Sequence, residues 1–267
     1  MDSEDLRKRV ELAKTLSQRA GAYLLERFGA VSRVSYKGSV DLVTEADETA
    51  EGLIRAGVSE HFPEDRILAE ETGASGDASG EWCWVIDPLD GTTNFVHGVR
   101  RFAVSVGLTH LGQPVGGVIY DPSHGETYHA RLGDGAWCNG QKLQVSARRQ
   151  LGESLLVTGF PYNRGECATE LTAVVARALE QARGLRRFGA ACLDLVDVAR
   201  GVLDGYWEPR LCPWDMAAGV VIVREAGGTV SRYGGREFDL NSPDLIASNG
   251  LIHSALSAMV DGDGETR

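Results

Sequence analysis

Two aspartates that lie three positions apart, Asp87 and Asp90, are the residues of this chain best placed for metal chemistry. They belong to the stretch WVIDPLDGTTNF, which starts with the apolar residues 84–86. An apolar run followed by a turn signal predicts a buried strand that ends at Asp87. Pro88 then favours a β-turn, whose first and fourth Cα atoms lie within about 7 Å of each other. Both carboxylates could therefore face one point.

Two carboxylates at that distance repel each other unless one is protonated or a cation lies between them. Oxygen ligands favour a hard ion such as Mg²⁺, Mn²⁺ or Ca²⁺ over zinc. The next residues, Gly91, Thr92 and Thr93, offer backbone N–H groups and hydroxyls of the kind that hold a phosphate oxygen. The same stretch, taken alone, also suits an ordinary solvated turn.

Further acidic residues stand where they could join such a site. Glu70 and Glu71 end the apolar strand predicted in RILAEE, and only one of them can face the site because side chains alternate along a strand. Asp215 falls at the start of the apolar helix predicted from Pro213, where the helix dipole favours a carboxylate. Asp215 could equally be a plain helix N-terminal charge.

The stretch KGSVDLVTEAD carries three more acidic residues, Asp41, Glu45 and Asp47, which can all be surface or capping residues. Thr44 followed by Asp47 resembles a capping box. The helix that it opens should end before Pro63.

Composition narrows the class of protein. With 267 residues, 43% of them hydrophobic, the chain can build one large domain or two closely packed ones. A formal net charge of −11 argues against nucleic acid as a partner. The five cysteines show no Cys-x-x-Cys spacing and are expected to be reduced core residues of a cytoplasmic protein. The sequence contains no apolar run of the kind that predicts secretion or membrane insertion.

Hydrophobic periodicity predicts two kinds of architecture along the chain. Residues 1–28 form a predicted helix, and a strand is expected near 31–37. Residues 72–81 predict a mobile loop beside the candidate site, and the strands after residue 101 predict an antiparallel meander. From about residue 154, strands alternate with helices near 167–182, 191–201 and 213–226, which indicates an α/β half.

Taken together, these stretches resemble the inositol monophosphatase family from about residue 5 to residue 258. The first family motif, from aspartate-proline to asparagine-phenylalanine, is met in full by residues 87–95. The second, from tryptophan-aspartate to glutamate-alanine-glycine-glycine, is met by residues 214–228. Two long motifs in the right order are far more specific than either motif alone.

The resemblance implies a fold and an oligomeric state. The fold is α/β, the layered α/β/α/β/α sandwich of the inositol monophosphatase and fructose-1,6-bisphosphatase type. It forms one domain over residues 1–267, with an antiparallel-sheet, metal-binding half in 1–150 and a smaller α/β half in 151–267. A homodimer is expected.

The resemblance also implies ligands for two metal ions. Glu70, Asp87 and the backbone carbonyl of Leu89 match the residues that bind one Mg²⁺. Asp87, Asp90 and Asp215 match those that bind a second. Two or three Mg²⁺ ions are expected, with Mn²⁺ as a substitute and with Li⁺ and Ca²⁺ as inhibitors.

Substrate contacts follow in the same way. Gly91 and Thr92 match the phosphate cradle, and Thr92 is expected to contact Asp47 and the attacking water, which makes Glu70, Thr92 and Asp47 the catalytic set. Glu208 matches a glutamate that bonds ring hydroxyls, and Ala191 matches a backbone position against the same ring. Asp90 and Asp215 border the substrate too. For Glu208 the alternative is a surface ion pair with Arg210.

The implied activity is Mg²⁺-dependent hydrolysis of a small phosphorylated polyol, with inositol monophosphate the first candidate. Alternatives in the same class are histidinol phosphate, fructose 1,6-bisphosphate and 3′-phosphoadenosine nucleotides. A different alternative is a non-catalytic partner of the transcription machinery, since some relatives have that role. The intact set of acidic ligands argues against a purely non-catalytic role.

The chain departs from the family pattern at several positions. Residues 99–101, Val-Arg-Arg, replace a segment that usually contains proline and add positive charge. Ala190 stands where a hydroxyl residue is frequent, and Asp197 stands where an aromatic residue is frequent. These changes are expected at the pocket wall or subunit side. His97, His124 and His129 have no spacing that indicates zinc or triad chemistry.

Overall fold

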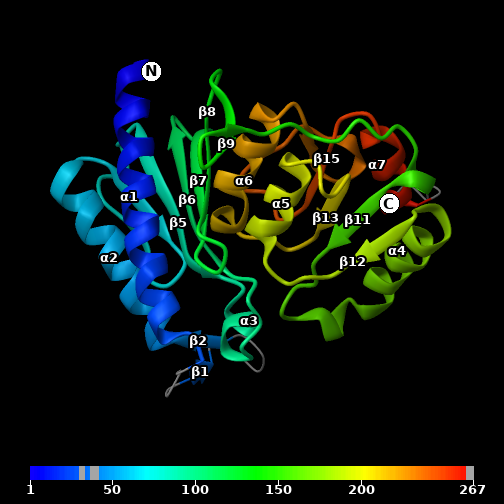
Figure 1. Cartoon of the computed structure of the whole chain (residues 1–267), viewed down its shortest axis with the longest axis horizontal. Coiled ribbons are helices and arrows are strands. Elements are labelled where there is room, and N and C mark those ends of the chain that lie inside the picture. The colour runs from blue at the N-terminus through cyan, green and yellow to red at the C-terminus, as the bar shows by residue number, and fades with distance from the viewer. Residues whose placement is uncertain (30–33, 37–41, 263–267) are drawn as a thin grey trace.

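The computed structural model describes residues 1–29, 34–36 and 42–262. Helices and sheets alternate in five layers, which confirms the predicted fold class (Figure 1). The outer pair α1 (Ser3–Arg27) and α2 (Glu45–His61) covers one face of a large sheet. The inner pair α5 (Ala191–Ala199) and α6 (Pro213–Glu225) lies between the two sheets. On the far side of the second sheet lie α4 (Ala168–Gln181) and α7 (His253–Asp261).

The large sheet has eight strands in the order β10-β9-β8-β7-β6-β5-β3-β4. Every neighbouring pair is antiparallel except β3 and β5, and the run from β6 to β9 confirms the predicted meander. Its strands are β3 (Arg66–Ala69), β4 (Gly73–Ser75), β5 (Trp82–Asp90), β6 (Ala103–His110), β7 (Gln113–Asp121), β8 (Glu126–Arg131), β9 (Gly135–Cys138) and β10 (Gln141–Lys142).

The second sheet has five strands in the order β12-β11-β13-β15-β14. Its strands are β11 (Leu155–Thr158), β12 (Gly184–Arg186), β13 (Gly205–Glu208), β14 (Thr229–Ser231) and β15 (Leu245–Ser248). The strands β11, β12 and β13 are parallel to one another, as expected for strands that alternate with helices. The strand β15 is antiparallel to both of its neighbours, β13 and β14. A separate two-stranded sheet pairs β1 (Val34–Tyr36) with β2 (Leu42–Thr44).

The helix α6 is a core element, because its residues from Met216 to Val223 are all buried. It packs against the large sheet at Gly107 and Gly117, which are cross-strand partners on β6 and β7. A Cβ atom on Gly117 would come within 2.5 Å of the Ala218 Cα atom. Glycine at these positions therefore lets the helix approach the sheet closely.

The structure corrects two local predictions. Residues 73–75 form the edge strand β4, paired antiparallel with β3, although the sequence predicted a loop from 72 to 81. The strand β5 runs through Asp90, although the sequence predicted that it ends at Asp87 in a β-turn. Of the strand expected near 31–37, only 34–36 is described, and Asp41 lies outside the described residues.

Two further predictions concern the cysteines and membrane insertion. Cys83, Cys167 and Cys192 are buried free thiols, and the other two cysteines are free and partly exposed. Across the described ranges, no helix is both long enough and apolar enough to cross a membrane.

Candidate active site

The carboxyl ends of β3 and β5 bring the first two acidic residues together. The two strands are parallel, with Ala69 beside Ile86, and the Glu70 N–H donates to the Ile86 carbonyl at 3.1 Å. Glu70 and Asp87 directly follow Ala69 and Ile86, so they lie side by side on neighbouring strands. Only 2% of Asp87 is exposed, whereas Glu70 is partly exposed.

A β-bulge brings Asp90 to the side of the sheet that Asp87 faces. Asp87 pairs with Ser105 of β6, and the next pairing joins Asp90 to a residue only two positions from Ser105. Between these pairs β5 therefore has one residue more than β6, and the Leu89 N–H donates to the Asp87 Oδ1 atom at 3.0 Å. In a regular strand, residues three apart face opposite sides, and one extra residue restores the same side.

The two aspartates meet a cysteine that sequence reasoning did not select. Ligand atoms of Asp87, Asp90 and Cys192 all lie within 4.8 Å of one another. Cys192 is fully buried in the first turn of α5, and its thiol donates to the Asp215 carbonyl at 3.4 Å. Burial raises the pKa of this thiol, as do Asp90 and Asp87. The only sequence signal was its position next to Ala191.

Asp90 also caps the helix α5. Its Oδ1 atom accepts the Ala191 N–H at 3.1 Å, and its Oδ2 atom accepts the Cys192 N–H at 2.8 Å. The residue before the helix is Ala190, which has no side-chain group for this purpose. A carboxylate of the large sheet thus fixes the start of a helix that packs between the sheets.

Asp215 both caps the start of a helix and lies near the acidic cluster, which are the two roles that the sequence allowed. It is the third residue of α6, and its Oδ2 atom accepts the Cys212 N–H at 2.7 Å. It also lies close enough to Asp87 for its charge to raise the pKa of that residue. Capping engages one of its two carboxylate oxygens.

Four predicted ligands therefore share one electrostatic environment. Burial raises the pKa of Asp87 most, and the charges of Glu70, Asp90 and Asp215 raise it further. Burial also raises the pKa of Asp215, with the Cys212 N–H acting in the opposite direction. A cluster of buried carboxylates that disfavours full ionisation has the donor chemistry of a site for a hard divalent cation.

Thr92, Leu89 and Asp47 form the next contact. The Thr92 hydroxyl lies 3.2 Å from the Asp47 Oδ1 atom and 3.0 Å from the Leu89 carbonyl oxygen, and its single proton can serve either. Asp47 is 1% exposed and lies in the first turn of α2. The expected contact between Thr92 and Asp47 is therefore present.

Gly91 allows the sharp change of direction after β5. Its φ is +86°, and it directly precedes the short helix α3 (Thr92–Val96). A Cβ atom here would lie 2.9 Å from the Arg101 carbonyl oxygen, so glycine is required for both conformation and space. The first N–H groups of a helix have no acceptor within it and remain available to a ligand.

Glu208 ends β13 and is 9% exposed. Burial raises the pKa of its carboxyl group to about 7, against the opposing effect of the Tyr206 hydroxyl, which donates to it at 2.7 Å. Asp90 raises this pKa further, which places Glu208 near the acidic cluster. The alternative ion pair with Arg210 is wrong, because Arg210 forms its ion pair with Glu166, at 3.5 Å.

Glu51 supports the site and was missed from the sequence. It is 1% exposed, and its carboxylate accepts the N–H groups of Glu71 and Thr72 at 2.8 and 3.1 Å. It thereby fixes the backbone that follows Glu70. Its spacing of one helical turn from Asp47 was the available signal.

Two residues that depart from the family pattern, Arg101 and Asp197, contact each other. The Arg101 Nη2 atom lies 2.6 Å from Asp194 and 2.9 Å from Asp197, and its guanidinium lies 4.3 Å from the centre of the Phe188 ring. The positive charge of Arg101 is therefore balanced by α5, and its partner Asp197 is another departure. Asp194, which is 1% exposed, was not selected from the sequence.

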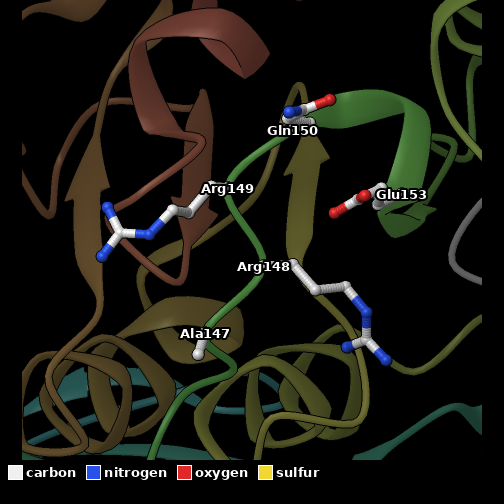
Figure 2. A pocket seen from close by; sticks show the side chains of 5 residues that line it. All are labelled: Ala147, Arg148, Arg149, Gln150 and Glu153. Carbon is white, nitrogen blue, oxygen red and sulfur yellow. The ribbon is translucent and has the colours of Figure 1, made fainter.

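The structure also has a surface depression that the predicted site residues do not line. It is lined by Ala147, Arg148, Arg149, Gln150 and Glu153, in the segment that leads into the second sheet (Figure 2). Arg148 already forms an ion pair with the buried Asp204 at 3.1 Å.

Comparison with known proteins gives the same family by sequence and by structure. The model of the inositol monophosphatase family matches residues 5–262. An inositol-1-monophosphatase from Synechocystis is 44% identical over 254 residues, which cover 95% of this chain and 88% of that protein. The structure of an inositol monophosphatase from Anabaena matches with a TM-score of 0.88 and 39% identity, over 96% of each chain. The Nus factor SuhB of Escherichia coli is 37% identical over 251 residues, which cover 93% of this chain and 94% of that protein.

Proposed function

Because the chain belongs to the inositol monophosphatase family and is a phosphatase, we propose that it hydrolyses inositol monophosphate with Mg²⁺ bound to its acidic cluster. The observation that carries this proposal is the convergence of Glu70, Asp87, Asp90 and Asp215 at the bulge of β5. Glu208 lies beside this cluster.

The proposed metal ligands divide into two overlapping groups. Glu70, Asp87 and the Leu89 carbonyl would hold one ion, and Asp87, Asp90 and Asp215 would hold another. Bound Mg²⁺ supplies positive charge that stabilises a phosphoryl group and lowers the pKa of a bound water. Mn²⁺ is the proposed substitute, and inhibition by Li⁺ and Ca²⁺ rests on the resemblance alone.

The chain's own residues would orient the substrate and handle one proton. Gly91 and Thr92 would donate backbone N–H groups to the phosphate oxygens. The Thr92 hydroxyl would accept a hydrogen bond from the attacking water while it donates to Asp47, which holds it at 3.2 Å. The backbone at Ala191 would lie against the ring.

Glu208 is the proposed selector of a polyol. Its carboxylate can accept hydrogen bonds from ring hydroxyls, and a polar site discriminates strongly against a substrate that lacks those hydroxyls. Its burial and its contact with the Tyr206 hydroxyl hold it in a fixed position.

The decisive experiment measures phosphate release, with Mg²⁺ and with EDTA, from a panel of esters. The panel contains inositol 1-phosphate, histidinol phosphate, fructose 1,6-bisphosphate, a 3′-phosphoadenosine nucleotide and p-nitrophenyl phosphate. We expect Mg²⁺-dependent release with the highest kcat/KM for inositol 1-phosphate. A higher value for another ester would assign the site to that substrate, and release that EDTA does not reduce would refute the metal assignment.

The similarity to a relative named Nus factor SuhB supports a second candidate, binding to the transcription machinery. This role need not exclude catalysis. An Asp87→Asn variant separates the two, because it should abolish hydrolysis without changing the outer surface. Cytoplasmic location, which rests on the free cysteines, and a homodimer, which rests on the resemblance, are further proposals, and light scattering of the purified protein tests the second.

A further inference from the structure

Arg187 is a cation beside the candidate site that the described residues leave without an ionic partner. Each of the nearby arginines Arg101 and Arg210 forms an ion pair, and Arg186 donates to the Leu185 carbonyl at 3.0 Å. Within the ranges that the structure describes, the contact of the Arg187 guanidinium is with the ring of Phe160, whose centre lies 5.6 Å away. All five of its N–H donors are therefore available.

Close contacts place this guanidinium at the border of the site. The Arg187 Nη1 atom lies against Gly189, because a Cβ atom there would be only 2.5 Å away. The Gly189 carbonyl lies 3.3 Å from the Asn94 Nδ2 atom and would be 3.4 Å from a Cβ atom on Gly91. Arg187 is thus separated from the proposed phosphate cradle by a single residue layer.

The other side of Arg187 leads to Glu208. Phe160, which the guanidinium contacts, follows Gly159, and a Cβ atom on Gly159 would collide with the Glu208 carboxylate. The positive charge of Arg187 also lowers the pKa of Glu208, as expected for neighbouring groups. The guanidinium therefore lies between the segment of Ala191 and the segment of Glu208, the two proposed walls of the ring site.

We propose that Arg187 is a specificity-determining residue that binds a second anionic group of the substrate, at the edge of the ring site. An arginine fork matches a phosphate or carboxylate, and it gains most where no protein carboxylate competes for it. This inference rests on the proposed function and extends its substrate class from inositol monophosphate to esters that carry a second negative charge.

Two fructose esters test the proposal, because one of them lacks the second phosphate. Fructose 1,6-bisphosphate and fructose 1-phosphate share the ester at C1, and only the first has a phosphate at C6. In Arg187→Ala, kcat/KM for the bisphosphate should fall about tenfold or more relative to fructose 1-phosphate, mainly through KM. Arg187→Lys should recover part of the loss, since it keeps the charge but not the fork.

The controls separate binding from folding. Arg186→Ala removes the neighbouring exposed arginine and should leave the ratio of the two substrates unchanged. Hydrolysis of p-nitrophenyl phosphate should change less than twofold in Arg187→Ala. If the wild type cleaves neither fructose ester, both are compared as inhibitors of p-nitrophenyl phosphate hydrolysis, where the same tenfold change in the bisphosphate is expected.

Two results would overturn the proposal. An unchanged ratio in Arg187→Ala would show that Arg187 does not contact the second charge. Equal losses on all three esters would show that it binds the scissile phosphate or supports the fold. Failure of the proposed function looks different, because then no ester would be hydrolysed in a Mg²⁺-dependent way by the wild type.

Discussion

Asp87 contributes to both proposed metal groups, so its replacement tests them together. The Asp87→Asn variant keeps the shape of the side chain and can still accept the Leu89 N–H. We expect kcat/KM to fall by more than the roughly 10- to 100-fold that loss of an outer-shell partner costs. Circular dichroism should show an unchanged fold, and a folded variant with full activity would remove Asp87 from the metal site.

Glu208 carries the proposed preference for polyols. Glu208→Ala should lower kcat/KM for inositol 1-phosphate by about tenfold or more, because a charge-assisted hydrogen bond contributes roughly 1.5–3 kcal/mol. p-Nitrophenyl phosphate has no ring hydroxyls and should be affected much less. Tyr206→Phe is the matched control, since it removes the hydroxyl that Glu208 accepts but leaves the carboxylate in place. Equal losses on both substrates in Glu208→Ala would assign Glu208 to the fold.

At the scale of elements, the approach of α6 to the large sheet depends on glycine. Gly117→Ala would place a Cβ atom 2.5 Å from the Ala218 Cα atom, and the backbone there cannot move aside like a flexible side chain. We expect a loss of about 1–3 kcal/mol in unfolding free energy, typical of an overpacked core. Urea denaturation measures it.

Gly52→Ala is the opposite control for that experiment. Gly52 lies on the exposed side of α2, and a Cβ atom there would have no neighbour within 4 Å. Alanine in a helix interior is about 0.5–1 kcal/mol more favourable than glycine. Gly52→Ala should therefore stabilise the protein, and a gain in stability for Gly117→Ala as well would contradict the close packing of α6.

The elements themselves could largely be predicted from the sequence, since hydrophobic periodicity locates α1, the meander and the later helices. The irregular part of β5 could not be predicted, because Pro88 indicates a turn as readily as a bulge. Local patterns give only a positional signal for Glu51 and Cys192, and they give none for Asp194. Their roles depend on contacts with residues far away in the chain, and no period in the sequence encodes those contacts.

At the scale of the whole molecule, the acidic cluster makes stability depend on pH and metal. The pKa of Glu208 rises from its ordinary value of 4.5 to about 7 in the folded state, and the pKa values of Asp87 and Asp215 rise too. Between the unfolded and folded pKa values the folded state binds more protons. Stability contributed by Glu208 is therefore present below about pH 4 and declines as the pH rises through about 7, and the contributions of Asp87 and Asp215 decline with rising pH in the same direction.

Thermal unfolding in EDTA tests this dependence. The Tm of the wild type should fall between pH 5 and pH 8 relative to that of Glu208→Gln, which lacks the carboxyl group whose pKa is raised to about 7. Mg²⁺ should raise the Tm of the wild type, and more at pH 8 than at pH 5, because a cation binds the ionised form. Parallel Tm curves for the two proteins would show that Glu208 does not titrate in this range. A single transition is predicted if residues 1–267 form one domain.

The extra residue in β5 changes the face of the sheet to which the following side chains point. The alternation of a strand assigns each side chain to one of two faces, and the bulge moves every later residue of β5 to the other phase. A variant that lacks Leu89 would restore regular pairing with β6 and should keep the sheet hydrogen-bonded. It would leave the carboxylate at position 90 on the side of Asp87, because residues two apart in a regular strand face the same side, but it would remove the Leu89 carbonyl, a proposed metal ligand that lies 3.0 Å from the Thr92 hydroxyl. Removing this one residue should therefore weaken Mg²⁺-dependent hydrolysis through the lost carbonyl, while much of the fold survives.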